Sequence, residues 1–149
     1  MDLNIPFKKH IWKIAAIGLG IIISILIIHI MQFINVALYP IGDSIMEFDR
    51  SVYADFVKEN PLFLIGILFS NLTGSFVGGA IARLTHPTVT MLMAGWVGLI
   101  LMLLDLYNLI TVDYPLWFWL LSIIIYIPAA WSGALAVAYF QTKQFEDIQ

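Results

Sequence analysis

Long apolar stretches alternate with short polar connections along the whole chain. Four of these stretches, at about 11–36, 62–84, 89–110 and 116–140, reach the roughly 20 mostly apolar residues that a membrane-spanning helix needs. The first is too long for the apolar core of a secretory signal, and no small-residue cleavage site follows it. The pattern therefore predicts an all-α membrane protein, a four-transmembrane-helix bundle that forms a single domain over residues 1–149.

The connections between the spans differ in length. Residues 84–88 and 111–115 are short links, so the second, third and fourth spans should run antiparallel to one another. The link between the first and second spans is longer, and its residues 44–59 place apolar side chains at helical spacing after a Ser44-x-x-Glu47 capping box. We expect an amphipathic extracytoplasmic helix over 44–59 that lies on the membrane surface or covers the mouth of the bundle. The alternative is an ordered loop with scattered apolar residues.

Lysine and arginine residues are distributed unevenly between the two ends of the predicted spans. Five lie on the side of the chain termini and two on the other, namely Lys8, Lys9, Lys13, Arg83 and Lys143 against Arg50 and Lys58. Because cytoplasmic loops of membrane proteins carry an excess of lysine and arginine, we expect both the N- and the C-terminus to be cytoplasmic.

The second span carries two neighbouring rows of small or short polar residues. One row has a spacing of four residues (Gly66, Ser70, Gly74, Gly78 and Ala82), and Asn71, Ser75 and Gly79 form the row beside it. Without bulky side chains, a helix face in lipid lets another backbone approach closely, and such close packing holds membrane helices together. We therefore expect helix packing through Gly66, Ser70, Gly74, Gly78, Gly79 and Ala82.

Several polar residues lie at similar depth in the outer third of different spans. Asp105 is the only acidic residue well inside a span, where a charge costs about 3 kcal/mol at the bilayer centre and less toward the edges. We expect a polar cluster near the outer face formed by His29, Gln32, Asn71, Asp105 and Asn108. Two interpretations remain open: a proton or cation site, or hydrogen bonding that only holds the helices together.

Three further features each have two interpretations. Arg83 and His86, at the cytoplasmic end of the second span, are placed to contact lipid headgroups or, alternatively, to bind an anionic lipid or ligand. Trp117 and Trp119 fit the aromatic belt at the membrane interface, and an aromatic cage for a substrate is the alternative. Pro128, near the middle of the fourth span, predicts a kink that either shapes the packing or serves gating.

The composition restricts the chemistry further. The 149 residues are 61% hydrophobic and only 11% charged, and the net charge of −3 offers no basic surface for nucleic acid. Cysteine is absent, which excludes disulfides, cysteine zinc sites and iron–sulfur clusters. The short motifs of metalloproteases, phosphate-binding loops and serine hydrolases are also missing. We therefore expect no enzymatic activity, no cofactor and no metal site, with membrane lipids as partners and no nucleic acid.

Parts of the second to fourth spans resemble a family of uncharacterised bacterial four-helix integral membrane proteins. The resemblance rests on Gly74-x3-Gly78-Gly79-x2-Ala82-Arg83, Pro115-Leu116-Trp117-Phe118, Pro128-Ala129-Ala130-x2-Gly133 and Tyr39-Pro40. The family often has a Glu and a His shortly before the Tyr-Pro pair, whereas this chain has Gln32 and Val36 there. The resemblance implies the four-helix fold and a bacterial cytoplasmic (inner) membrane, and it implies no function.

Two functions fit this sequence. The first is a non-enzymatic scaffold or accessory subunit that packs through its small-residue faces against itself or against other membrane subunits. The alternative is a small homo-oligomeric channel or transporter for an ion or small solute, with Asp105, His29 and Asn71 at its polar site. Gly74→Leu or Gly78→Leu should break assembly under the first function, and Asp105→Asn should abolish flux under the second.

Overall fold

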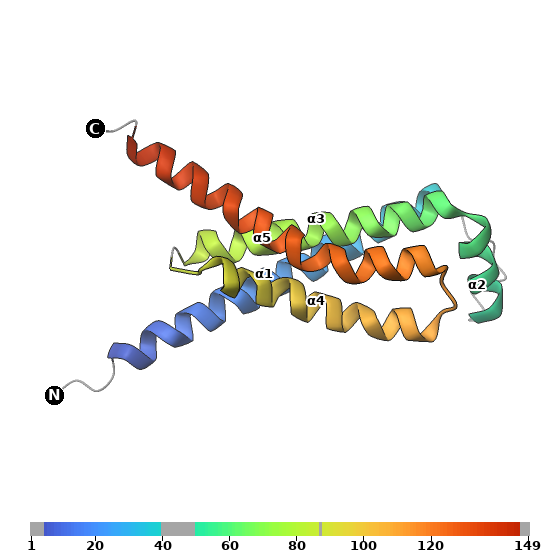
Figure 1. Ribbon diagram of the computed structural model, residues 1–149, viewed down its shortest axis with the longest axis horizontal. Coiled ribbons are helices and arrows are strands. Elements are labelled where there is room, and N and C mark those ends of the chain that lie inside the picture. The colour runs from blue at the N-terminus through green and yellow to red at the C-terminus, as the bar shows by residue number, and fades with distance from the viewer. Residues whose placement is uncertain (1–4, 40–49, 87, 147–149) are drawn as a thin grey trace.

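Five helices make up the part of the protein that the structure describes. This structure is a computed structural model, and it describes residues 5–39, 50–86 and 88–146. The helices are α1 (Ile5–Leu38), α2 (Arg50–Glu59), α3 (Pro61–Thr85), α4 (Met91–Thr111) and α5 (Leu116–Glu146) (Figure 1). No strand occurs among the described residues, so the predicted all-α fold is confirmed.

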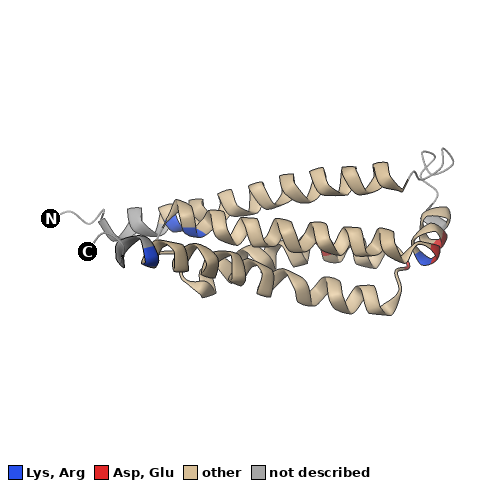
Figure 2. Cartoon of the chain, turned by 90° about the horizontal axis from the view of Figure 1, so that it is seen from above, with Lys and Arg blue, Asp and Glu red and all other residues tan. Residues whose placement is uncertain are grey.

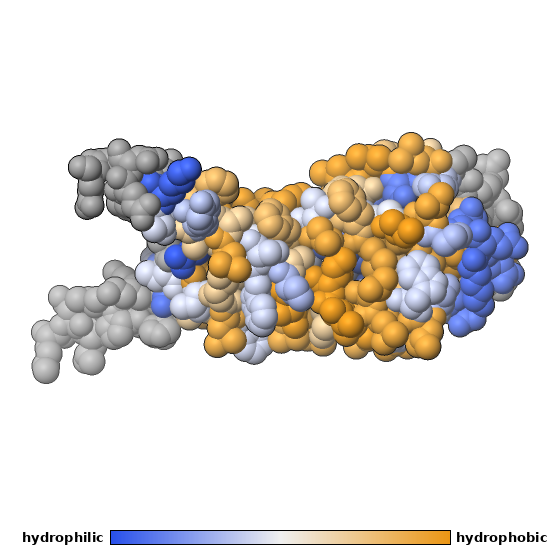
Figure 3. Space-filling model, turned by 45° about the horizontal axis from the view of Figure 1, so that its top comes forward, coloured by the Kyte–Doolittle hydropathy of each residue, from blue (hydrophilic) through white to orange (hydrophobic). Residues whose placement is uncertain are grey.

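Four of these helices are long and apolar enough to cross a membrane. The candidate spans are Ile11–Leu38, Pro61–Thr85, Met91–Thr111 and Leu116–Lys143. Many of their large apolar side chains are exposed, which would be costly in water and suits contact with lipid. Figure 3 shows these hydrophobic side chains over the middle of the molecule, with hydrophilic residues toward both ends. These features indicate an integral membrane protein.

The two ends of the bundle differ in the chain segments and charged residues that they carry. Both chain termini lie at one end, here named the inner end, and α2 lies at the opposite, outer end (Figure 1). In Figure 2, most of the ribbon coloured for lysine and arginine lies near the inner end, and most of that coloured for acidic residues lies around α2. This arrangement agrees with an even number of spans. The expected cytoplasmic location of the termini stays a prediction.

The helix α3 is the centre of the bundle. It packs along most of its length against α1 on one side and α5 on the other, whereas α4 pairs mainly with α5. The contacts of α4 with α1 and α3 are much less extensive, and within the described residues the backbones of α1 and α5 do not approach each other. The seam between α1 and α4 is therefore the least tightly packed side of the bundle.

Small residues explain how α1 and α5 approach α3 so closely. A Cβ atom added at Gly78 would lie 1.8 Å from Ser24 Oγ of α1, and one added at Gly20 would lie 2.5 Å from the Gly78 carbonyl oxygen. On the other side of α3, a Cβ at Gly79 would lie 2.0 Å from the carbonyl oxygen of Ala130 in α5. Only glycine fits at such distances, because nearly every Cβ contact is longer than 3.0 Å.

The structure places the two small-residue rows of α3 inside the chain. Ser70, Gly74, Gly78, Gly79 and Ala82 are all buried. Gly66 lies against α1, where a Cβ atom would be 2.2 Å from Asn35 Oδ1. These contacts are made with α1 and α5 of the same molecule, so they do not require another protein.

The short helix α2 closes the outer end. Its Val57 is fully buried, and Tyr53 and Phe56 pack against Phe63 at the start of α3, whereas Asp55 is exposed. The predicted amphipathic segment began at residue 44; its Ser44–Glu47 capping box lies outside the described residues. The described helix begins at Arg50 and covers the end of the bundle. This is one of the two predicted placements; the other was on the membrane surface.

An exposed ion pair ties α2 to the connection between α4 and α5. The Lys58 ammonium donates to the Asp113 carboxylate. This hydrogen bond is the main cause that raises the pKa of Lys58 above its ordinary value, so the lysine stays charged at neutral pH. The pair links the two segments that lie over the outer end of the bundle.

The helix α5 continues through its internal proline. Pro128 removes one backbone donor near the middle of the helix, and α5 changes direction there in Figure 1. The glycine after this bend, Gly133, lies against α3, where a Cβ atom would be 1.9 Å from the Phe76 carbonyl oxygen. The bend thus lies near a contact between α3 and α5 that leaves no room for a Cβ atom.

Candidate functional site

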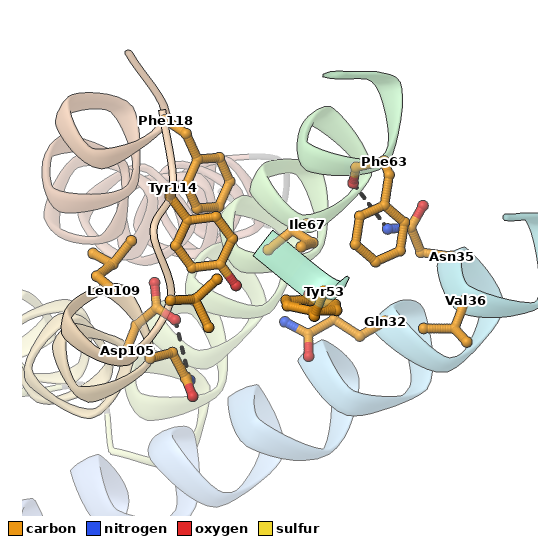
Figure 4. A pocket seen from close by; sticks show the side chains of 12 residues that line it. Gln32, Asn35, Val36, Tyr53, Phe63, Ile67, Asp105, Leu109, Tyr114 and Phe118 are labelled. Atoms are coloured by element: carbon orange, nitrogen blue, oxygen red, sulfur yellow. Dashed lines mark hydrogen bonds between the residues drawn. The ribbon is translucent and has the colours of Figure 1, made fainter. Parts of the chain in front are cut away.

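A cavity of about 300 Å³ lies between the outer halves of α1 and α4, beneath α2 (Figure 4). All five helices and the α4–α5 connection contribute side chains to its wall. The lining residues are Gln32, Asn35, Val36, Tyr53, Phe63, Ile67, Asp105, Asn108, Leu109, Val112, Tyr114 and Phe118. The cavity thus occupies the loosely packed seam between α1 and α4.

A second cavity of about 170 Å³ adjoins the first and reaches toward the middle of the bundle. Gln32, Asp105 and Asn108 line both cavities, and His29 and Asn71 line the second. The structure therefore brings all five polar residues of the predicted cluster to the walls of two adjoining cavities. We refer to the two cavities together as the polar cleft.

Asp105 is the charged residue of the polar cleft. It lies six residues from the outer end of α4, which corresponds to a depth of about 9 Å along the helix. Its Oδ1 accepts a hydrogen bond from Asn108 Nδ2 at 3.5 Å, the limit for such a bond. Its Oδ2 is buried and makes no hydrogen bond of normal geometry, although the Tyr126 hydroxyl of α5 lies near the carboxylate. None of the described residues that line the cleft is a lysine or arginine, and His29 forms no ion pair with the carboxylate.

Asn71 faces the same cleft from α3. Its side chain is only 1% exposed, and its amide nitrogen Nδ2 has no hydrogen-bond partner. Buried polar atoms are normally paired, so a donor and an acceptor left unpaired around one cavity require an explanation. The Asp105 oxygen would be partnered by a donor or a cation, whereas the Asn71 nitrogen would need an acceptor.

His29 lies on the wall of the cleft and is turned toward its own helix. Its Nδ1 is 2.8 Å from the carbonyl oxygen of Ile25, one turn earlier in α1. Among the described residues, no hydrogen bond or ion pair joins His29 to Asp105. The two side chains share the deeper cavity without forming the direct contact that their equal depth allows.

Asn35 is a site residue that the predicted cluster did not contain. Its Nδ2 donates to the carbonyl oxygen of Phe63 at 3.0 Å, which links α1 directly to α3. The side chain fills the space above Gly66, so that glycine is needed for the contact. The available signal was its position one turn after Gln32 on the face of α1 that carries polar residues.

Two tyrosines close the outer end of the larger cavity. Tyr53 comes from α2 and Tyr114 from the α4–α5 connection, and Figure 4 shows both rings beside the cavity. Burial raises the pKa of Tyr53 and, more strongly, that of Tyr114, whose pKa is also raised by its neighbour Tyr53. Both hydroxyls therefore stay protonated at neutral pH.

The remaining predicted site residues lie away from the polar cleft. At the inner end, Arg83 Nη1 donates to the carbonyl oxygen of Val89, and His86 Nδ1 lies 2.8 Å from Thr88 Oγ1. Both side chains therefore contact the α3–α4 connection, and their contact with lipid headgroups stays a prediction. Trp117 and Trp119 are two residues apart on α5 and do not face each other, so they do not enclose a common space.

No known protein family, no curated protein and no solved structure matches this chain. The resemblance to uncharacterised four-helix membrane proteins is therefore supported only by the four apolar helices themselves.

Proposed function

We propose that the protein is a non-enzymatic transporter that binds a small cation in the polar cleft. The observation that carries the proposal is the buried Oδ2 of Asp105, which has no hydrogen-bond partner, in a cleft lined by no described lysine or arginine. A carboxylate at this depth in a membrane is stabilised by a proton or by another cation. Asn71 and Gln32 supply neutral polar groups beside it.

The packing of the inner half supports a transporter rather than an open channel. Below the cleft, Ala82, Val97 and Ala130 are fully buried and belong to one apolar cluster. A cation in the cleft would meet this cluster, so release toward the inner end requires helices to move. The bend of α5 at Pro128 lies at the same level and offers a place for such a movement.

Flux measurements on reconstituted protein test this proposal. We expect proteoliposomes to take up one or more of H⁺, Na⁺, K⁺ and methylammonium, and Asp105→Asn to reduce that uptake at least about tenfold, since a lost hydrogen bond to a charged group costs about 1.5–3 kcal/mol. The matched control is Asp55→Asn, which removes an exposed carboxylate of α2 and should leave uptake unchanged.

Two results would contradict the proposal. One is wild-type protein that transports none of these cations, and the other is full uptake by an Asp105→Asn variant whose thermal unfolding matches the wild type. The expected scaffold or accessory role would be favoured instead by stoichiometric copurification with other membrane subunits, measured by native mass spectrometry. That role has less support, because the small-residue rows of α3 pack within the chain.

A further inference from the structure

The larger cavity has walls that a site for an inorganic cation would not need. Besides Asp105 and the amide groups of Gln32, Asn35 and Asn108, it is lined by the aromatic rings of Tyr53, Tyr114 and Phe118 and by several aliphatic side chains. A metal ion that sheds its water requires several oxygen or nitrogen ligands in their place. Among the described residues, no three acidic, histidine or cysteine side chains come together in that way. One carboxylate and three amide groups beside aromatic and aliphatic side chains suit a cation that itself carries apolar groups.

Two of the aromatic rings that line the cavity lie against each other. The centroids of Tyr114 and Phe118 are 4.7 Å apart, and the rings are inclined at 34°. The face of an aromatic ring attracts a cation, and more strongly when both are shielded from water. Because burial keeps the Tyr114 hydroxyl protonated, its ring adds no charge of its own. Asp105 is thus the single charge that faces the cavity from the lining residues.

The volume of the cavity and its aliphatic side chains restrict the ligand further. A cavity of about 300 Å³ is at the lower limit for pockets that hold organic molecules. Val36, Ile67 and Leu109 offer apolar contacts and no hydrogen bonds, so they suit alkyl groups. A small ion with both a positive charge and alkyl groups would match all of these surfaces.

We propose that the cation bound by the cleft is a small organic ammonium ion. Its charged nitrogen would pair with the Asp105 carboxylate, and its alkyl groups would lie against the rings of Tyr114 and Phe118. This inference rests on the proposed function, because it names the substrate class of the same site.

Binding measurements with three chloride salts test the substrate class. Isothermal titration of the protein in nanodiscs compares methylammonium, tetramethylammonium and K⁺ at equal ionic strength. We expect both ammonium ions to bind more tightly than K⁺, and Asp105→Asn to weaken their binding about tenfold or more. Asp55→Asn, the exposed control, should bind them as the wild type does.

Two substitutions of Tyr114 distinguish the contribution of its ring to binding from that of its hydroxyl group. Tyr114→Leu removes the aromatic face and should weaken tetramethylammonium binding about three- to tenfold, whereas Tyr114→Phe keeps the face and should have little effect. Equal weakening by both variants would mean that the hydroxyl group binds the ligand, and it would overturn the inference. The comparison of salts on the wild type does not depend on how well either variant folds.

The outcomes also separate this inference from the proposed function. Asp105-dependent binding and uptake of K⁺ without binding of either ammonium ion would overturn the inference and leave the proposed function standing. No binding of either ammonium ion, together with no uptake of H⁺, Na⁺, K⁺ or methylammonium, would overturn both. Tighter binding of the ammonium ions, lost in Asp105→Asn and reduced in Tyr114→Leu, would support both.

Discussion

Gly79→Ala should destabilise the folded bundle by about 1–3 kcal/mol or more, although it adds only one methyl group. The new Cβ atom would lie 2.0 Å from the carbonyl oxygen of Ala130 in α5 and 2.8 Å from its Cα atom. These are backbone atoms that cannot rotate away, so α3 and α5 must move apart along their contact. The separation would weaken the van der Waals packing that holds membrane helices together.

Gly18→Ala is the matched control for this prediction. The same methyl group is added within α1, where a Cβ atom at Gly18 would meet no atom within 4 Å, so stability should be unchanged or slightly higher. Thermal unfolding of both variants in detergent, followed by tryptophan fluorescence, makes the comparison. Gly133→Ala tests the same interface from the α5 side, because its Cβ would lie 1.9 Å from the Phe76 carbonyl oxygen. Equal unfolding midpoints for Gly79→Ala and Gly18→Ala would contradict the described contact.

The membrane-spanning helices can be predicted from the sequence, but which helices pack against one another cannot. Apolar stretches of sufficient length indicate spans, because a helix satisfies all of its own backbone hydrogen bonds in lipid. The short link 84–88 predicts that the second and third spans are neighbours, yet α3 packs mainly against α1 and α5. Which helix lies against the row of Gly74 and Gly78 depends on the rotation of each helix about its axis, and a single small-residue pattern leaves that rotation open.

The candidate site shows a similar limit. Depth along a span can be counted from the sequence, and His29 and Asp105, which the count puts at a similar depth, line the same cavity. Depth does not tell where a side chain points, and His29 is turned toward the Ile25 carbonyl oxygen of its own helix. For the same reason, Tyr114 fits an interfacial belt by position but lines the cavity in the structure. Whether such a side chain faces the membrane interface or the cavity depends on how the helices and connections are arranged around the outer end.

Phe63→Ala should release α2 from the bundle and cost about 3–5 kcal/mol, the usual range for a buried phenylalanine. Phe63 is 2% exposed at the first turn of α3, beside the outer cavity. Three rings pack edge-on against it: Tyr39 at 6.1 Å, Tyr53 at 6.5 Å and Phe56 at 5.2 Å between centroids. Two of these rings belong to α2, so the loss of Phe63 removes the aromatic support of the helix that covers the polar cleft.

Hydrogen exchange and thermal unfolding distinguish this local effect from general damage to the fold. In Phe63→Ala, the backbone amides of α2 should exchange markedly faster, while those in the middle of α3 and α5 should change less. Phe69→Ala is the control on the same helix: Phe69 is 60% exposed and faces outward, so its loss should leave the exchange of α2 unchanged. If both substitutions accelerate exchange in α2 equally, Phe63 does not anchor this helix. If only Phe63→Ala does so and cation uptake changes with it, the closure of the cleft by α2 contributes to transport.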